Sequence, residues 1–158
     1  MATRAPATIE TTSGSPAETH ALARRLGAVA QPGDVLALAG ELGAGKTAFA
    51  KGFGEGLGVR GTTVASPSFI LMAEHAGRLP LFHMDLYRLE GPRDAIDGGL
   101  LDERQADGVT LIEWPERLAD ALPAPRLDVT IEPTGETERR ITLTAVGEGL
   151  ERYLEAAG

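Results

Sequence analysis

The sequence of 158 residues contains neither cysteine nor asparagine. The absence of cysteine excludes disulfides, thiolate metal sites and cysteine nucleophiles, and it is compatible with a reducing cytosol. No segment approaches the ~20 apolar residues that a membrane-spanning helix needs, and the N-terminus lacks the apolar core of a signal peptide. We therefore expect a soluble, cytoplasmic protein that does not associate with membranes.

Lysine is scarce: Lys46 and Lys51 are the only two in a chain that otherwise uses arginine for positive charge. The formal net charge is −8 at pH 7. A surface that grips nucleic acid needs clustered lysine and arginine, so this acidic balance argues against direct binding. The two adjacent arginine pairs, at 24–25 and 139–140, are interpreted as solvated faces. Any role in nucleic-acid metabolism is expected to depend on a partner.

A phosphate-loop motif is the most informative feature of the chain. Residues 40–47 read Gly-Glu-Leu-Gly-Ala-Gly-Lys-Thr and match the pattern G-x-x-x-x-G-K-[ST] at every specified position. The apolar run 35–39 is typical of a buried parallel strand, and a helix-compatible segment begins at Lys46. Glycines let several backbone N–H groups converge on one anion, which the next helix favours with its positive end. We predict a nucleoside triphosphate here, with Lys46 at the outer phosphates and the Thr47 hydroxyl on Mg²⁺.

Around this motif, apolar periodicity and turn signals predict a single domain over residues 1–158, with 1–7 as a loose tail. The fold class is α/β: a P-loop NTPase-like three-layer sandwich with a mainly parallel central sheet and antiparallel hairpin additions. Ser15 and Glu18 form a capping box that marks a helix start at Pro16. The expected strands are 8–12, 35–39, 69–74, 79–86, 109–114, 126–132 and 139–146, and the expected helices begin near 16, 46, 115 and 148, with one or two short ones within 91–108.

Two carboxylates each close an apolar run: Asp85 follows residues 81–84 and Glu113 follows residues 109–112. A phosphate loop needs an acidic group to complete Mg²⁺ coordination or to polarise a water, and such groups stand at the ends of core strands. We predict that both belong to the site, with their roles undivided. The alternative for each is a carboxylate that simply reaches solvent.

Ser66-Pro67-Ser68-Phe69 offers hydroxyls on a constrained loop, because the residue before a proline is pushed out of helical geometry. This loop is either a sensor of the terminal phosphate or a polar lead-in to a strand. The absence of asparagine bears on the base, since GTPases usually read guanine with an N-K-x-D element. ATP is therefore favoured over GTP.

Four segments together resemble the TsaE family, also called YjeE, which is the ATPase component of bacterial tRNA threonylcarbamoyladenosine biosynthesis. They are Gly40 to Thr47, Ser66-Pro67-Ser68-Phe69, His83-Met84-Asp85-Leu86-Tyr87-Arg88-Leu89 and Glu113-Trp114-Pro115-Glu116. The resemblance covers nearly the whole chain. The sequence departs from the family pattern at Ser68, Ala48 and Glu41, where threonine, a hydroxylated residue and aspartate are common. None of these changes removes a required group.

The resemblance implies a role for each matching residue. Lys46, Asp85 and Glu113 are the implied catalytic residues, with Asp85 at a Walker-B-like position, and Thr47, Asp85 and Glu113 are the implied Mg²⁺ ligands. The implied nucleotide-binding residues are Glu41, Leu42, Gly43, Ala44, Gly45, Lys46, Thr47, Ala48, Ser66, Ser68 and Trp114. His83, Tyr87 and Arg88 complete the family signature without an assigned contact.

The family also implies partners. Its members act with the TsaB and TsaD proteins, which transfer the threonylcarbamoyl group to adenosine 37 of tRNA, so tRNA contact is expected to be indirect and ATP hydrolysis weak without the partners. Two alternatives stay open. One is a small-molecule kinase, for which Arg93 and Arg104 in segment 91–108 are weak lid candidates. The other is a nucleotide-dependent binding module in which hydrolysis is incidental.

Overall fold

The computed structural model describes residues 7–41, 43–60, 72–87 and 103–158. The elements are β1 (Ala7–Ser13), α1 (Pro16–Ala28), β2 (Val35–Ala39), α2 (Lys46–Gly56), β3 (Met72–His75), β4 (Leu81–Asp85), the 3₁₀ helix η1 (Glu103–Asp107), β5 (Val109–Glu113), the 3₁₀ helix η2 (Pro115–Ala121), β6 (Arg126–Pro133), β7 (Arg139–Val146) and α4 (Glu151–Ala157). The start of the strand expected at Phe69 and the helices expected within 91–102 lie outside the described residues. Ala7, expected in the loose tail, is the first residue of β1.

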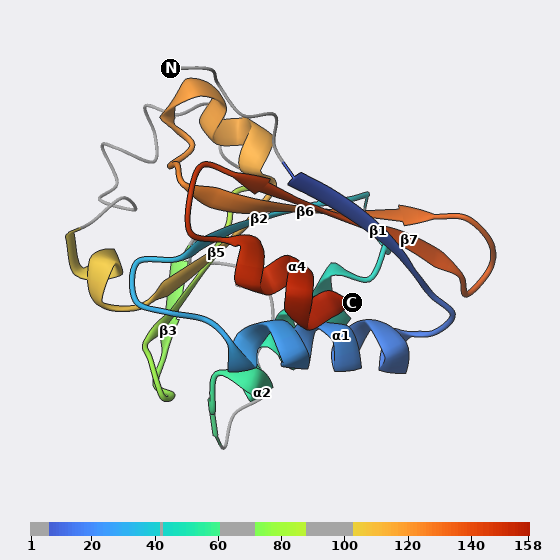
Figure 1. Cartoon of the computed structure of the whole chain (residues 1–158), viewed down its shortest axis with the longest axis horizontal. Coiled ribbons are helices and arrows are strands. Elements are labelled where there is room, and N and C mark those ends of the chain that lie inside the picture. The colour runs from blue at the N-terminus through green and yellow to red at the C-terminus, as the bar shows by residue number, and fades with distance from the viewer. Residues whose placement is uncertain (1–6, 42, 61–71, 88–102) are drawn as a thin grey trace.

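One seven-stranded sheet organises the molecule, in the order β1-β7-β6-β2-β5-β4-β3 (Figure 1). The four central strands β6, β2, β5 and β4 run parallel to one another. The hairpins β6–β7 and β3–β4 and the added strand β1 are antiparallel. The predicted hairpin additions are therefore confirmed. Parallel pairing is confined to the centre, however, because three described pairings are parallel and three are antiparallel.

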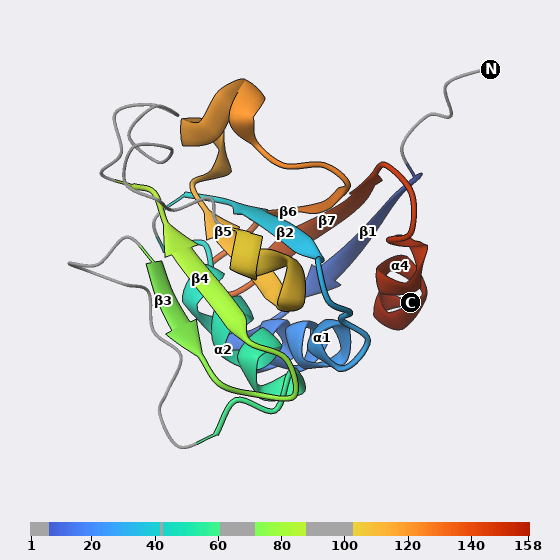
Figure 2. The ribbon, with the colours of Figure 1, turned by 90° about the vertical axis from the view of Figure 1, so that its left-hand side faces the viewer.

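Helices α1 and α2 lie side by side against one face of the sheet, and α4 packs on the same side near β1 and β7 (Figures 1 and 2). This layer buries the larger core, in which Leu36 and Leu38 of β2 meet Phe49 and Phe53 of α2. On the opposite face a smaller core forms around Met84, Ile112 and Leu118. Among the described residues, only 3₁₀ helices cover that face, so the third layer is thinner than expected.

The helix predicted from Pro115 to Leu122 is the 3₁₀ helix η2, and it is kinked at Ala119, where φ is +46°. Its entry is also distorted, since Trp114 at its N-cap has φ of +58°. Positive φ is costly for a residue with a side chain and requires support from surrounding structure. Pro115 correctly predicted where this element begins. The local sequence did not predict that it would be a 3₁₀ helix rather than an α-helix.

Close approach of α1 and α2 explains the glycines of α2. A Cβ at Gly52 would lie 2.2 Å from the carbonyl oxygen of His20, and one at Gly56 would lie 2.2 Å from that of Arg24. Such distances are far inside van der Waals contact, so only glycine lets the two backbones meet here. Close packing of α2 against α1 offsets the low intrinsic helix propensity of its glycines.

The predicted N-cap of α1 is present, because the Ser15 hydroxyl accepts a hydrogen bond of 3.1 Å from the Glu18 N–H. The Glu18 carboxylate accepts from the N–H of Gly14 rather than from that of the cap residue. The described part of the chain holds no helix both long and apolar enough to cross a membrane.

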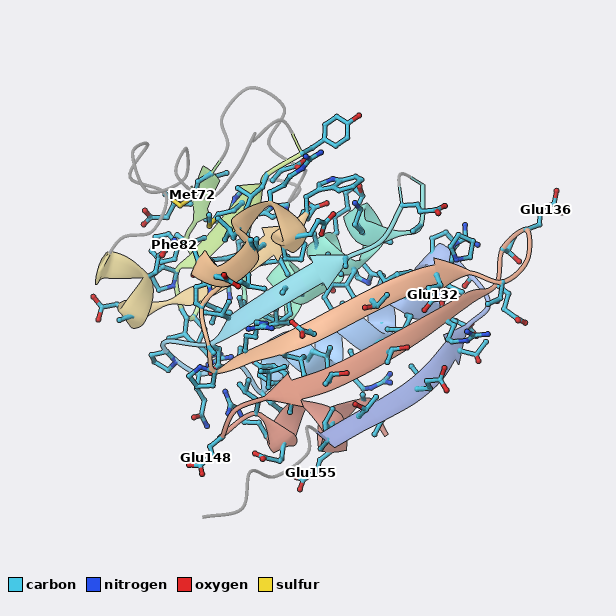
Figure 3. All side chains as sticks on the ribbon, turned by 90° about the horizontal axis from the view of Figure 1, so that it is seen from above. Met72, Phe82, Glu132, Glu136, Glu148 and Glu155 are labelled. Carbon is cyan, nitrogen blue, oxygen red and sulfur yellow. The ribbon has the colours of Figure 1, made fainter. Side chains whose placement is uncertain are left out.

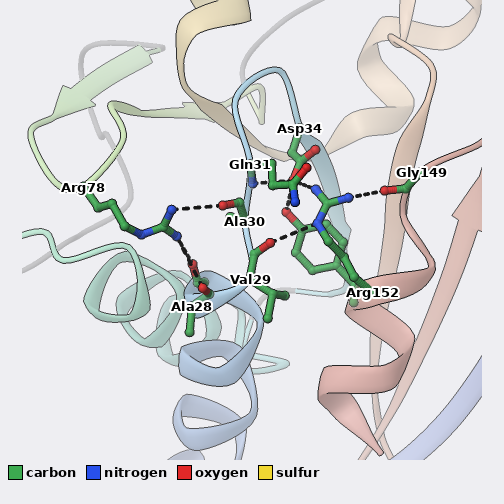
Figure 4. Close-up of polar contacts among 10 residues, drawn as sticks. Ala28, Val29, Ala30, Gln31, Asp34, Arg78, Gly149 and Arg152 are labelled. Atoms are coloured by element: carbon green, nitrogen blue, oxygen red, sulfur yellow. Dashed lines mark hydrogen bonds and ion pairs between the residues drawn. The ribbon is translucent and has the colours of Figure 1, made fainter.

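A polar cluster ties the C-terminal helix to the start of β2 (Figure 4). The Asp34 carboxylate accepts hydrogen bonds from the Arg152 guanidinium, the Tyr153 hydroxyl and, at 2.8 Å, the N–H of Gln31. Arg152 also donates through Nε to the Val29 carbonyl at the end of α1, at 2.9 Å. Three elements that are distant in the sequence are therefore joined directly before the strand that leads to the phosphate loop.

Candidate functional site

The glycine loop connects the end of β2 to the first turn of α2. Gly43 and Gly45 have φ of +80° and +112°, in the left-handed region that favours glycine. A Cβ at either position would meet nothing within 4 Å. Backbone conformation, rather than crowding, therefore requires glycine here, and the space beside the loop is open. Open backbone at the start of a helix is a geometry that receives anions.

Lys46 is the first residue of α2, and its side chain lies inside the site. The residue is 6 % exposed, and its Nζ has no hydrogen-bond partner among the described residues. Nζ lies 4.0 Å from the centroid of the Trp114 ring. Burial lowers the pKa of Lys46, while the carboxylates of Glu113 and Asp85 oppose this shift. A buried ammonium without hydrogen bonds is costly, so this position suits an anionic ligand.

Asp85 and Glu113 are neighbours across the sheet. They end the parallel strands β4 and β5 and stand opposite each other in the register. Asp85 is half-buried, and its Oδ1 accepts a hydrogen bond of 3.1 Å from the N–H of Tyr87. Burial raises the pKa of Asp85 and Glu113 adds to this, whereas the Tyr87 N–H, His83 and Lys46 oppose it. The two strand ends therefore bring both predicted carboxylates to one edge.

Glu113 is held by a residue to which the sequence assigned no contact. Its Oε2 lies 2.5 Å from Nε2 of His83, and both side chains are buried. Glu113 therefore does not simply reach solvent. Residues two apart on a strand share a face, so the position of His83 two residues before Asp85 was the available signal. Which carboxylate it would meet depends on the pairing of β4 with β5.

Two aromatic side chains border the same region. The rings of Tyr87 and Trp114 have centroids 5.0 Å apart and are inclined by 55°. Tyr87 is 46 % exposed, whereas Trp114 is partly covered and lies against Lys46. This edge-inclined arrangement is a favourable aromatic geometry. The pair forms one wall of the site.

These groups line a hollow of about 460 Å³. Gly43, Gly45, Lys46, Thr47 and Ala48 contribute from the loop and helix, and Asp85, Tyr87, Glu113 and Trp114 contribute from the strand ends. Pro16, at the start of α1, completes the lining, and the sequence predictions did not include it. Most of the predicted site residues that the structure describes are thus brought together.

The other predicted residues are placed differently. Glu41 lines a neighbouring hollow of about 510 Å³, which shares Trp114 and extends along the end of β6. Ala44 is buried and borders a small pocket that shares Pro16, Gly43 and Gly45 with the hollow of about 460 Å³. Predicted residues outside the described ranges are Leu42, Ser66, Ser68, Arg88 and Arg93, and the side chain of Arg104 is not described either.

The fold and the site define a mixed α/β protein in which one sheet presents a glycine loop, a buried lysine and two strand-end carboxylates to a single hollow. The family model described as "Threonylcarbamoyl adenosine biosynthesis protein TsaE" matches residues 13–141. The chain belongs to the TsaE family.

Individual relatives agree with this membership. A tRNA threonylcarbamoyladenosine biosynthesis protein TsaE of Bacillus subtilis is 47 % identical over 142 residues, which cover 89 % of this chain and 88 % of the relative. A protein of the same name from Streptomyces coelicolor is 41 % identical and covers 80 % of this chain and 90 % of its own length. The crystal structure of Bacillus subtilis YdiB superposes with a TM-score of 0.80 at 39 % identity, covering 98 % of this chain and 97 % of that one.

Proposed function

We propose that this protein is a P-loop ATPase that binds and hydrolyses Mg·ATP in support of tRNA threonylcarbamoyladenosine biosynthesis. The observation that carries the proposal is the Lys46 ammonium, which is buried without a hydrogen-bond partner among the described residues. It lies beside a loop whose glycines leave open space. A nucleotide's phosphates would supply the missing negative charge and acceptors.

In this proposal the loop amides and Lys46 hold the phosphate chain, and the Thr47 hydroxyl serves Mg²⁺ together with Asp85 and Glu113. No group of three or more His, Cys, Asp or Glu side chains suited to a metal occurs in the described ranges. Mg²⁺ at a nucleotide site usually takes one or two carboxylates and the substrate's own phosphates as ligands, and Asp85 and Glu113 can supply the carboxylates. Bound Mg²⁺ would neutralise charge on the phosphates.

Roles for the protein groups follow from their contacts. The short contact of His83 with Glu113 fixes the orientation of a buried carboxylate. Asp85 is partly exposed at the end of β4, beside Glu113, and is suited to positioning water or metal there. Trp114 borders both hollows and is suited to contact the nucleotide. Leu42, Ser66 and Ser68 keep their expected roles in nucleotide binding as part of the proposal.

The proposed biological role follows the names of the relatives, which place those proteins in tRNA threonylcarbamoyladenosine biosynthesis. We propose TsaB and TsaD proteins as partners, with tRNA contacted only through them, and a cytoplasmic location. The net charge of −8 supports indirect contact with tRNA, because an ATPase that docks on a protein complex does not need to bind the tRNA phosphates itself.

Phosphate release from ATP tests the proposal, measured for the protein alone and with the matching TsaB and TsaD proteins. Hydrolysis should rise with the partners and vanish in Lys46→Ala. Turnover that ignores the partners and yields a phosphorylated metabolite would instead identify a small-molecule kinase. Partner function that persists when turnover is blocked would identify a nucleotide-dependent binding module.

A further inference from the structure

The adjacent arginines Arg139 and Arg140, interpreted from sequence as one solvated face, point to opposite sides of β7. Arg140 is exposed and forms ion pairs with Glu10 of β1, at 3.4 Å, and with Glu132 of β6, at 3.8 Å. Arg139 is half-buried and turns toward the glycine loop. The alternation of side chains along a strand separates the two.

Within the described part of the chain, Arg139 donates its hydrogen bonds to four backbone carbonyls. On the loop side, Nε donates to the oxygen of Ala44 at 3.0 Å, and Nη2 donates to that of Gly43 at 3.4 Å. On the other side, Nη1 donates to Glu138 at 2.9 Å and to Gly135 at 3.2 Å. The guanidinium therefore bridges the glycine loop and the β6–β7 turn with four hydrogen bonds, whereas an ammonium has only three N–H donors.

Peptide geometry gives these contacts a consequence for the loop amides. In a trans peptide the carbonyl of one residue and the N–H of the next point in opposite directions. A guanidinium that holds the Ala44 carbonyl on its own side directs the Gly45 N–H away from it. It also polarises that peptide, which strengthens the N–H as a donor. Gly43 and Gly45 of the loop line two adjoining hollows, of which one is also lined by Arg139 and the other by Lys46.

We propose that Arg139 is a positioning residue of the phosphate loop. By holding the carbonyls of Gly43 and Ala44, it fixes the loop backbone, directs the Gly45 N–H and places a permanent positive charge behind it. The Ala44 N–H is already donated to the Glu41 carbonyl, at 3.0 Å. The inference rests on the proposed binding of a nucleoside triphosphate. It adds that occupancy of the loop is coupled to the order of the β6–β7 turn.

Two hydrogen bonds between Thr134 and Glu138 close the β6–β7 turn. The Thr134 N–H donates to the Glu138 carbonyl at 3.0 Å, and the Thr134 hydroxyl donates to the Glu138 carboxylate at 3.0 Å. Figure 3 shows Glu136 at the tip of this hairpin, at the far end of the sheet's long strands. The turn is thus closed by its own hydrogen bonds and joined to the phosphate loop through Arg139.

The test compares Arg139→Ala with Arg140→Ala, which removes the same charge from the next position of the same strand. Dissociation constants for Mg·ATP and Mg·ADP are measured by calorimetry, and thermal unfolding is measured without nucleotide. Arg139→Ala should bind about tenfold or more weakly, because the Gly45 N–H loses its fixed direction and the positive charge behind the loop is removed. Arg140→Ala should bind within about twofold of wild type. Nucleotide-free Arg139→Ala should unfold at a lower temperature than Arg140→Ala, because it loses four hydrogen bonds within the protein.

Amide hydrogen exchange supplies a second readout. Nucleotide should slow exchange in residues 134–138 of wild type and Arg140→Ala, but not of Arg139→Ala. If Arg139→Ala does not fold, Arg139→Lys replaces it, because lysine keeps the charge and stem but not the fork. Weaker binding in that variant supports the proposal.

Each contrary outcome has a distinct meaning. Equal affinities in Arg139→Ala and Arg140→Ala, or wild-type affinity in Arg139→Lys, would overturn the positioning role while leaving nucleotide binding intact. A lower unfolding temperature with unchanged affinity would make Arg139 a structural residue only. Absence of binding in the wild-type protein would overturn the proposed function and this inference with it.

Discussion

The ammonium of Lys46 lies 4.0 Å from the centroid of the Trp114 ring, so the single tryptophan of the chain covers the lysine of the phosphate loop. A desolvated cation–π contact is worth about 2 kcal/mol. That is small beside the cost of burying an ammonium that lacks hydrogen bonds. The residual cost is the physical reason for expecting an anion at this position.

Replacing Lys46 should separate ligand binding from folding. In wild type, Mg·ATP at ~100 times its dissociation constant should stabilise the protein by about 2.7 kcal/mol through mass action. Lys46→Ala should abolish this stabilisation without unfolding the protein, because it removes a buried cation that lacks a hydrogen-bond partner among the described residues. Thermal unfolding with and without nucleotide measures both effects. Lys51→Ala, at the only other lysine, is the control and should keep the shift. If Lys46→Ala failed to fold, Lys46 would be required for the folded structure and not only for ligand binding.

The strand-end carboxylates should affect turnover more than binding. With partners present, Asp85→Asn and Glu113→Gln should each lower the rate of ATP hydrolysis by about 100-fold, the order expected when a group that handles metal or a proton is lost. Nucleotide affinity should change far less. Steady-state phosphate release and calorimetry make the comparison. Glu116→Gln, at an exposed carboxylate of the neighbouring hollow, should retain turnover. Wild-type rates in both site variants would remove Asp85 and Glu113 from the mechanism.

The contact between α1 and α2 should not tolerate a methyl group. Gly52→Ala improves intrinsic helix propensity by ~1 kcal/mol, yet its Cβ would lie 2.2 Å from the His20 carbonyl oxygen. Overpacking of this kind typically costs about 1–3 kcal/mol, and a clash with backbone is at the upper end. Urea unfolding should therefore show net destabilisation. Gly135→Ala meets only an ordinary contact at 3.6 Å and should be nearly neutral. A stabilised Gly52→Ala would show that the helices can separate.

The buried Tyr153 should make the protein less stable in alkali. Burial, with the adjacent Asp34 carboxylate, raises the pKa of Tyr153 well above its usual value of 10.0. As pH rises above about 10, the unfolded chain loses the phenolic proton while the folded protein keeps it, so stability falls. Tyr153→Phe should remove this dependence and cost about 1–3 kcal/mol at neutral pH through loss of the hydrogen bond to Asp34.

Urea unfolding at several pH values, compared between wild type and Tyr153→Phe, isolates this group. Lys46 has a lowered pKa and an opposite pH dependence, but both proteins carry it, so it cancels in the difference. Tyr87→Phe, at an exposed tyrosine, is the control and should follow wild type. If the free energy of unfolding of wild type and Tyr153→Phe changed with pH by the same amount, the prediction would be contradicted.

Much of the fold could be predicted from local signals. The capping box at Ser15, the apolar run of β2 and the glycine turn of the β6–β7 hairpin each specify an element within a few residues. The 3₁₀ pitch of η2 and its kink at Ala119 could not be predicted, since they depend on packing against the smaller core. The same holds for the thin layer on that face of the sheet.

By itself the sequence determined the phosphate loop, the strand that precedes it and the two carboxylates that close core strands, because each depends on residues adjacent in the chain. Only the tertiary structure decided which of these groups meet. The register of β4 against β5 places Asp85 beside Glu113, and Glu113 beside His83. The strand alternation of β7 sends Arg139 to the loop and Arg140 to solvent. Spacing along a chain specifies local geometry, whereas contacts between distant segments arise only when the whole sheet and its helices pack together.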